Sequence, residues 1–161
     1  MKTAVVYYSL LGNVEFAANE IAKEIDCDVI KLNPVKSYPK SKGKLIFLGG
    51  MKSVFKSKPK LKEYDFDADK YDQIVIGTPT WAGTFAPAIR TFLRDNKDSI
   101  KDKKISVFVS CSGGEAESVL QKTKEFLGID NLNASVVLTD PKNKPSEENN
   151  ALVDDFINKI K

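Results

Sequence analysis

Short apolar runs alternate along this chain with stretches in which apolar residues recur at helical spacing. Thr3 to Tyr8 is apolar and rich in β-branched and aromatic residues, which predicts a buried strand. From Val14 to Ile25, apolar residues recur at i, i+3, i+4 and i+7, as in an amphipathic helix, and Asn13 stands at its expected N-cap. By the same criteria we expect strands at 28–32, 73–77, 105–110 and 134–139, and helices at 42–56, 85–96, 115–127 and 152–160.

The order of these elements predicts the architecture. Strand and helix alternate five times, so we expect the α/β class, with a three-layer, doubly wound fold in which helices cover both faces of a five-stranded parallel sheet. The helix at 42–56 is the least regular, because Gly49 and Gly50 each disfavour it by about 1 kcal/mol. A length of 161 residues fits one domain, and neither a repeat nor a low-complexity linker divides it. We therefore expect a single domain over residues 1–161.

Histidine is absent from the sequence. Its absence excludes Ser-His-Asp and Cys-His catalytic arrangements, an imidazole base, and zinc sites that mix cysteine with histidine. The two cysteines, Cys27 and Cys111, are too few for a four-thiolate site and lack Cys-x-x-Cys spacing. If the protein carries out chemistry, we expect a bound cofactor to supply it, with no metal and no catalytic side chain.

Charge is unevenly distributed along the chain. The net charge is +3, but residues 31–62, the lysine block, hold ten lysines and no Asp or Glu, so the block carries +10 and the other 129 residues carry −7. Such a block can meet an anionic surface or an acidic protein. Charge runs are more often solvated surface, and we favour that interpretation. Nucleic-acid binding is not expected, because no aromatic platform or recognition helix accompanies the lysines.

The sequence contains no apolar run of about 18 residues, the length of a membrane span, and its N-terminus lacks the pattern of a signal peptide. Two unpaired thiols suit a reducing compartment. We expect a cytoplasmic protein that does not associate with membranes.

Three predicted loops share a composition rich in glycine and hydroxyl residues. They follow the first, third and fourth predicted strands and cover 9–14, 78–84 and 110–114. In a doubly wound sheet, ligands bind outside the carboxyl ends of the strands, where the strand order reverses. The first loop suits a phosphate, because it opens a helix and Gly12 lets the backbone approach closely, with Ser9 and Asn13 beside it. An ordinary strand-to-helix turn capped by Asn13 is an equal alternative.

The residues of these loops carry a family resemblance. The chain resembles the flavodoxin family in three segments, in the same order and spacing: YSLLGN at 8–13, IGTPTWAGTFAPAIRTFL at 76–93 and FVSCSGGEAE at 108–117. The resemblance extends over essentially the whole chain and is most specific in the middle segment. It implies the flavodoxin-like fold with strand order 2-1-3-4-5, non-covalently bound FMN, and electron transport or flavin-dependent oxidation and reduction.

The resemblance also implies the cofactor-binding residues, position by position. The first loop would hold the FMN phosphate, the second would surround the flavin ring and ribityl chain with Trp81 beside the isoalloxazine, and the third would bond with the pyrimidine end of the ring. These residues are Ser9, Leu10, Leu11, Gly12, Asn13 and Val14 in the first loop; Thr78, Pro79, Thr80, Trp81, Ala82 and Gly83 in the second; and Ser110, Cys111, Ser112, Gly113 and Gly114 in the third. The implied partner is a redox protein or a small electron acceptor.

The sequence departs from the family pattern in two places. Leu11 and Val14 stand where hydroxyl residues usually flank Gly-Asn, and each lost hydrogen bond to a charged phosphate is worth about 1.5–3 kcal/mol. Because the backbone N–H donors remain, we expect weakened FMN binding rather than none. The third loop contains no aromatic residue to cover the outer face of the ring, which leaves this face open to a partner or a substrate.

Three functions are compatible with the sequence. The first is an FMN-binding flavodoxin-like protein that moves electrons between protein partners. The second is a flavin-dependent oxidoreductase that reduces a quinone or another small acceptor at the open face. The third is a non-flavin binding or regulatory domain that kept the fold and lost the phosphate loop. A phospho-receiver domain is not expected, because the strand ends carry Tyr8, Ser9 and Thr78 in place of an acidic cluster.

Overall fold

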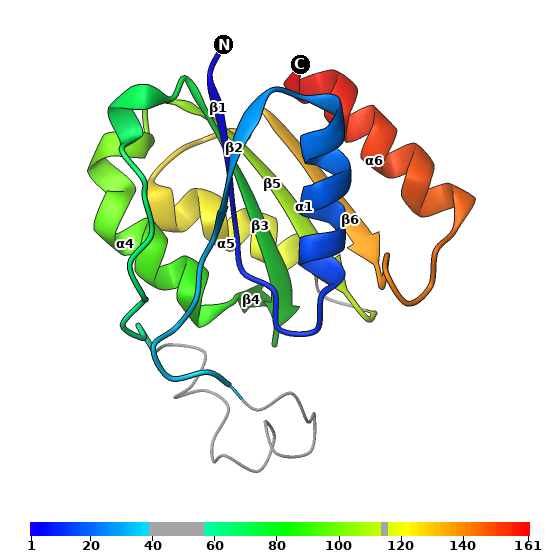
Figure 1. Ribbon diagram of the computed structural model, residues 1–161, viewed down its shortest axis with the longest axis horizontal. Helices are drawn as coiled ribbons and strands as arrows, with labels where there is room; N and C mark the ends of the chain where they lie inside the picture. The colour runs from blue at the N-terminus through cyan, green and yellow to red at the C-terminus, as the bar shows by residue number, and fades with distance from the viewer. Residues whose placement is uncertain (39–56, 114–115) are drawn as a thin grey trace.

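A central parallel sheet organises the protein. The computed structural model describes residues 1–38, 57–113 and 116–161. Five parallel strands lie in the order β2-β1-β3-β5-β6, and a two-residue strand, β4, pairs antiparallel with β3 (Figure 1). The strands are β1 (Thr3–Tyr7), β2 (Cys27–Lys31), β3 (Gln73–Trp81), β4 (Thr84–Phe85), β5 (Lys104–Cys111) and β6 (Ala134–Thr139). With β4 set aside, this order is the predicted 2-1-3-4-5, so the predicted fold class is confirmed.

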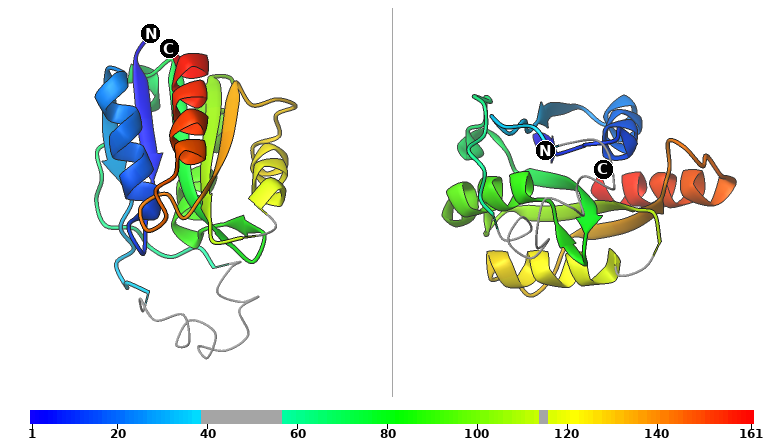
Figure 2. Two further views of the ribbon diagram at one scale, coloured as in Figure 1. Left: turned by 90° about the vertical axis from the view of Figure 1, so that its right-hand side faces the viewer. Right: turned by 90° about the horizontal axis from the view of Figure 1, so that it is seen from below.

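Helices within the described residues cover both faces of the sheet. They are α1 (Asn13–Glu24), α4 (Pro87–Ile100), α5 (Ala116–Leu127) and α6 (Glu147–Ile160), and a 3-10 turn, η1 (Ala68–Lys70), precedes β3. α1 and α6 pack on one face while α4 and α5 pack on the other, which gives three layers (Figure 2). Successive strand residues point to opposite faces. Val5 and Tyr7 accordingly join the core under α1 and α6, whereas Ala4 and Val6 join the core under α4 and α5.

The end of β3 and the start of α6 differ from the predicted elements, and α6 begins at Glu147, five residues before the predicted start at 152. The sequence predicts that β3 ends at Gly77, but it continues to Trp81, because it pairs with β5 as far as Pro79 and then with β4. Ala82 and Gly83 make the tight turn between β3 and β4, and both have positive φ (47° and 67°), as a type I′ hairpin requires. Residue 85 belongs to β4, so α4 begins two residues later than predicted.

The predicted N-cap of α1 is wrong. Gly12, at φ 93°, occupies the cap position without a side-chain hydrogen bond, and Asn13 is the first helical residue. The Asn13 side chain instead donates to Asp140 Oδ1 at 2.7 Å and accepts from the Lys142 backbone N–H at 3.0 Å. A contact with the far end of the chain has therefore replaced the local capping bond that the sequence pattern suggests.

Residues 33–35 and 60–62 pair with each other beyond the end of β2. Pro34 and Leu61 form an antiparallel bridge, and the flanking backbone hydrogen bonds, Val35 to Lys60 and Lys62 to Asn33, are both 2.8 Å long. The described lysines of the block are all exposed: Lys31, Lys36, Lys58, Lys60 and Lys62. These five fit the solvated interpretation. The block's other lysines and the predicted helix at 42–56 lie outside the described residues.

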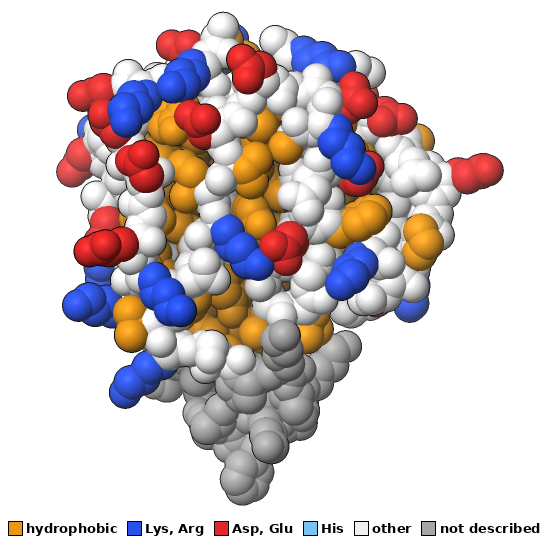
Figure 3. All heavy atoms as spheres, viewed as in Figure 1, with side chains coloured by type: hydrophobic (Ala, Val, Ile, Leu, Met, Phe, Trp, Pro, Cys, Tyr) orange, Lys and Arg blue, Asp and Glu red, His pale blue; other side chains and the backbone are white. Residues whose placement is uncertain are grey.

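Acidic and basic side chains are interspersed on the face of the protein drawn in Figure 3. In the part of the chain that the structure describes, no helix has the length and apolar character needed to cross a membrane.

Candidate functional site

The three glycine- and hydroxyl-rich loops meet at one edge of the sheet. β1, β3 and β5 are parallel neighbours, so the loops that leave their carboxyl ends emerge together at the lower edge in Figure 1. β2 lies on one side of β1, whereas β3, β5 and β6 lie on the other side. The strand order therefore reverses between β1 and β3. Doubly wound sheets bind ligands at such a reversal. The tertiary structure thus brings together the three loops that the sequence pattern predicts as one site.

The first loop, residues 9–12, leads from β1 into α1. Ser9 Oγ accepts a hydrogen bond from the Gly12 backbone N–H at 3.1 Å, which closes the loop. The N–H groups in the first turn of α1 have no partner within the helix and, with the helix dipole, favour an anion. Leu11 is exposed (45%), whereas Val14 is buried (1%) in the core under α1. The Val14 side chain therefore does not contribute to the surface of the loop, whereas the Leu11 side chain does.

The second loop comprises the end of β3 and its hairpin to β4. Thr78 is fully buried, and its hydroxyl accepts from the Ala86 backbone N–H at 3.0 Å, so this side chain holds the hairpin in place. Thr80 differs, because its Oγ1 is buried and has no hydrogen-bond partner among the described residues. A buried hydroxyl without a partner is destabilising by about 1–3 kcal/mol. Thr80 Oγ1 is thus an unsatisfied polar atom in the loop to which the resemblance assigns the flavin ring.

The tip of this hairpin is anchored to α5. Gly83 O accepts hydrogen bonds from Ser118 Oγ at 2.7 Å and from Lys122 Nζ at 2.6 Å. Ala82 at the tip is exposed, whereas Pro79 on the strand is half-buried. The anchoring fixes the turn on the scaffold, which a loop that positions a ligand requires.

Trp81 lies in an aromatic cluster with Tyr8 and Tyr38. Its ring meets both tyrosines edge to face, with centroid distances of 6.1 Å to Tyr8 and 5.1 Å to Tyr38. Burial raises the pKa of Tyr8 well above its usual value, and the nearby Tyr38 raises it further, so the Tyr8 hydroxyl stays neutral near pH 7. Half-buried Leu10 packs, like Trp81 and Tyr38, against the core under α4 and α5.

Sequence reasoning missed both tyrosines of this cluster. Tyr8 directly precedes the first loop, so its position in the sequence is a usable signal. Nothing in the sequence places Tyr38, because its position follows from the antiparallel pairing of residues 33–35 with 60–62.

The third loop combines buried and open positions. Ser110 and Cys111 are buried at the end of β5. Ser112 and Gly113 are exposed, and a Cβ on Gly113 (φ 138°) would meet no atom of the described residues within 4 Å. Gly114 lies outside the described residues. The exposed part of this loop therefore has no aromatic side chain of its own, and no described residue covers Gly113.

A fourth segment, residues 140–144 between β6 and α6, also borders the first loop. Asn13 bonds with both Asp140 and Lys142, and the Asp140 N–H donates to Cys111 O at 2.9 Å. The Lys142 side chain extends over Gly12, with its Nζ 2.9 Å from the position that a Cβ on Gly12 would occupy. Sequence reasoning missed this segment, because the Asn13–Asp140 contact joins residues 127 positions apart.

The groups at this edge fit a phosphorylated flavin. The first turn of α1 offers backbone donors to an anion, while Thr80 offers an unsatisfied hydroxyl and Trp81 an aromatic ring. Within the residues that the structure describes, no cluster of three or more Cys, Asp or Glu side chains could hold a metal ion. The assignment of individual loop residues to parts of the cofactor stays a prediction.

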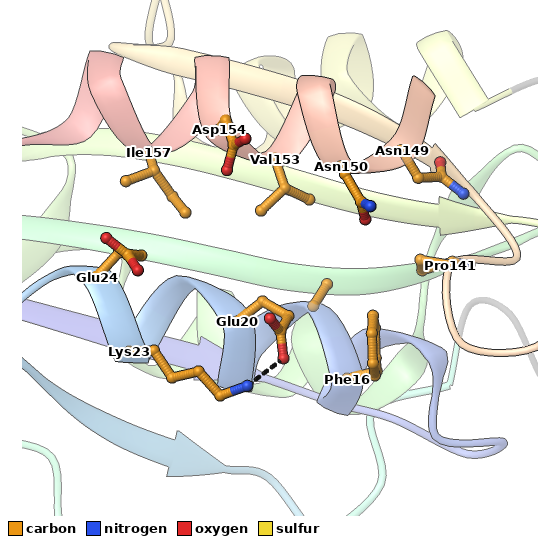
Figure 4. A pocket seen from close by; sticks show the side chains of 11 residues that line it. Phe16, Glu20, Lys23, Glu24, Pro141, Asn149, Asn150, Val153, Asp154 and Ile157 are labelled. Carbon is orange, nitrogen blue, oxygen red and sulfur yellow. Dashed lines mark hydrogen bonds and ion pairs between the residues drawn. The ribbon is translucent and has the colours of Figure 1, made fainter. Parts of the chain in front are cut away.

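A separate groove runs between α1 and α6 (Figure 4). Its volume is about 340 Å³, and Phe16, Val153 and Ile157 are among the residues that line it. Glu20 and Lys23, which form an ion pair at 2.6 Å, lie on its α1 side. The groove shares no residue with the three loops and lies along the helices rather than at the carboxyl ends of the strands, so the cofactor is not assigned to it.

Comparison with known proteins identifies the family. Residues 52–140, more than half of the chain, match the family model of the flavodoxin domain. Among solved structures, a flavoprotein in complex with FMN from Lactobacillus acidophilus has a TM-score of 0.73 and 23% identity, over 96% of this chain and 97% of that chain. A flavodoxin from the domain Archaea has a TM-score of 0.56 and 20% identity, over 99% of each chain. These likenesses show the fold, and the family model shows membership: the chain belongs to the flavodoxin-domain family.

Proposed function

We propose that this protein binds FMN non-covalently and carries electrons between protein partners. The observation that carries the proposal is the convergence of three loops at the carboxyl edge of β1, β3 and β5, in a chain of the flavodoxin-domain family. The FMN bound to the Lactobacillus acidophilus flavoprotein supports the choice of cofactor. FMN, when bound, supplies the chemistry of oxidation and reduction, and the residues of the chain bind it, orient it and exclude water.

Each loop has a distinct role in this proposal. The first loop binds the phosphate through Ser9 and the backbone N–H groups at the start of α1. The second loop binds the ring and ribityl chain, where Thr80 Oγ1 gains the hydrogen bond that it lacks and Trp81 contacts the ring. The backbone of Ser112 and Gly113 bonds with the pyrimidine end. No side chain needs to act as an acid or a base, which fits a chain without histidine.

Titration of the purified protein with FMN tests this proposal. Trp81 is the only tryptophan, so tryptophan fluorescence reports on the second loop alone. We expect FMN to quench this fluorescence saturably and to remain with the protein, which then shows a flavin absorption spectrum, through gel filtration. A protein that stays colourless with added FMN, without quenching, would refute the proposal. That result would favour the third function, a non-flavin binding or regulatory domain.

A second candidate function is reduction of a small acceptor, such as a quinone, by the flavin-loaded protein. The exposed Ser112 and Gly113 favour it, because no described residue lies within 4 Å of a Cβ on Gly113 and a small molecule can approach from that side. Steady-state oxidation of a pyridine nucleotide in the presence of a quinone separates the two functions. A carrier shows almost no turnover until a reductase is added, whereas a reductase turns over alone.

A further inference from the structure

Lys142 places a positive charge at the start of α1. Its Nζ lies 2.9 Å, and its Cδ 3.4 Å, from the Cβ position of Gly12, so the side chain lies across this glycine. The backbone of Lys142 is fixed at the same place, because its N–H donates to Asn13 Oδ1 at 3.0 Å. The Asn13 amide also donates to Asp140 Oδ1 at 2.7 Å. The segment 140–144 is therefore held against the first residue of α1 by two hydrogen bonds from one side chain.

None of the ion pairs among the described residues includes Lys142. The acidic residue in the first turn of α1, Glu15, bonds with Lys31 Nζ at 2.7 Å. That hydrogen bond is the main reason that the pKa of Glu15 lies below its usual value, and the charge of Lys142 contributes least. The helix dipole also disfavours a cation at this end of a helix and favours an anion. An anion between Lys142 and the first turn of α1 would stabilise both.

We propose that Lys142 binds the phosphate of FMN and supplies the donors that Leu11 and Val14 lack. This inference rests on the proposed function and adds to it a residue from the β6–α6 segment. Leu11 and Val14 offer no side-chain hydrogen bond, and Val14 is buried in the core, whereas a lysine ammonium offers three N–H donors and a full charge. Asn13 becomes a positioning residue, because it holds the segment that carries Lys142.

The test compares FMN with riboflavin, which has the same ring and ribityl chain but no phosphate. Wild-type protein, Lys142→Gln, Lys142→Arg and Lys144→Gln are titrated with each flavin by Trp81 fluorescence. Lys144 is the matched control, because it is an exposed lysine of the same segment. We expect Lys142→Gln to weaken FMN binding by about 10- to 100-fold, the range of one charge-assisted hydrogen bond, without changing riboflavin binding. Lys142→Arg and Lys144→Gln should resemble wild type.

Ionic strength provides a second readout. The preference of the wild type for FMN over riboflavin should fall as salt rises, and this dependence should be weaker in Lys142→Gln, because salt screens the exposed charge. An FMN-to-riboflavin affinity ratio that Lys142→Gln leaves unchanged would overturn the role of Lys142 while flavin binding itself stands. A wild type that binds riboflavin as tightly as FMN would overturn it as well. A wild type that binds neither flavin refutes the proposed function, and this inference falls with it.

Discussion

Replacing Thr80 by valine should have opposite effects on the free protein and on cofactor binding. Thr80 Oγ1 is buried and without a hydrogen-bond partner in the described structure, so the free protein carries the desolvation penalty of this hydroxyl, about 1–3 kcal/mol. Valine has nearly the same shape and no polar group. We therefore expect Thr80→Val to raise the free energy of unfolding of the cofactor-free protein by about 1–2 kcal/mol. In a chain of this size, that is a Tm increase of roughly 2–8 °C.

FMN binding should respond in the other direction. If Thr80 Oγ1 bonds with the cofactor, Thr80→Val loses one neutral hydrogen bond, worth about 0.5–1.5 kcal/mol, or roughly a 2- to 10-fold weaker affinity. Thr78→Val is the matched control, because the Thr78 hydroxyl accepts from the buried N–H of Ala86 at 3.0 Å. Its loss leaves that N–H unpaired, so we expect Thr78→Val to destabilise the cofactor-free protein by about 1–3 kcal/mol.

Urea unfolding of the cofactor-free variants and fluorescence titration with FMN measure the two effects separately. A Thr80→Val protein less stable than wild type would show that the hydroxyl is satisfied in solution, and the reasoning would fail at its first step. A stabilised variant that binds FMN as tightly as wild type would show that the unsatisfied hydroxyl does not serve the cofactor.

Gly77, Tyr7 and Asn13 provide further tests. Gly77→Ala should lower the free energy of unfolding by about 1–3 kcal/mol or more, because the new Cβ would lie 2.2 Å from Cζ of the fully buried Phe108. Urea unfolding should show a smaller loss of stability in a Phe108→Leu background, and an equal loss there would contradict the clash. Burial and the neighbouring Glu15 raise the pKa of Tyr7 from 10.0 to about 12, so this residue stabilises the fold below pH 10 and that contribution is lost as pH rises toward 12. The free energy of unfolding measured from pH 8 to 12 should fall less steeply in Tyr7→Phe than in wild type, and parallel curves would exclude the effect. Asn13→Ala removes both side-chain bonds to the 140–144 segment, so FMN affinity should fall while riboflavin affinity does not, as titration of both flavins can show.

The convergence of the three loops was predictable from the sequence, because it depends on local pattern and on the parallel topology alone. The predicted loops 9–14, 78–84 and 110–114 each follow a predicted strand with a clear apolar run, and parallel neighbours necessarily bring such loops to one edge. The hairpin of β4 was missed, because Ala82 is an unusual residue for a positive φ and gives no local turn signal. The N-cap was wrong for a related reason: Asn13 has the right chemistry for a cap, but its side chain bonds with Asp140 and Lys142.

The sequence by itself determined the α/β class, the alternation of strands and helices, and which glycine- and hydroxyl-rich loops follow the strands, because hydrophobic periodicity and turn composition are local properties of the chain. The tertiary structure alone decided which side chains share the site. Tyr38 lies against Trp81 beside the pairing of residues 33–35 with 60–62, and Lys142 lies over Gly12 where Asn13 bonds with the 140–144 segment. Thr78 and Thr80 look alike in the sequence, yet packing gives one hydroxyl a partner and leaves the other without one. Contacts between distant segments depend on how the whole sheet assembles, and no local pattern encodes them.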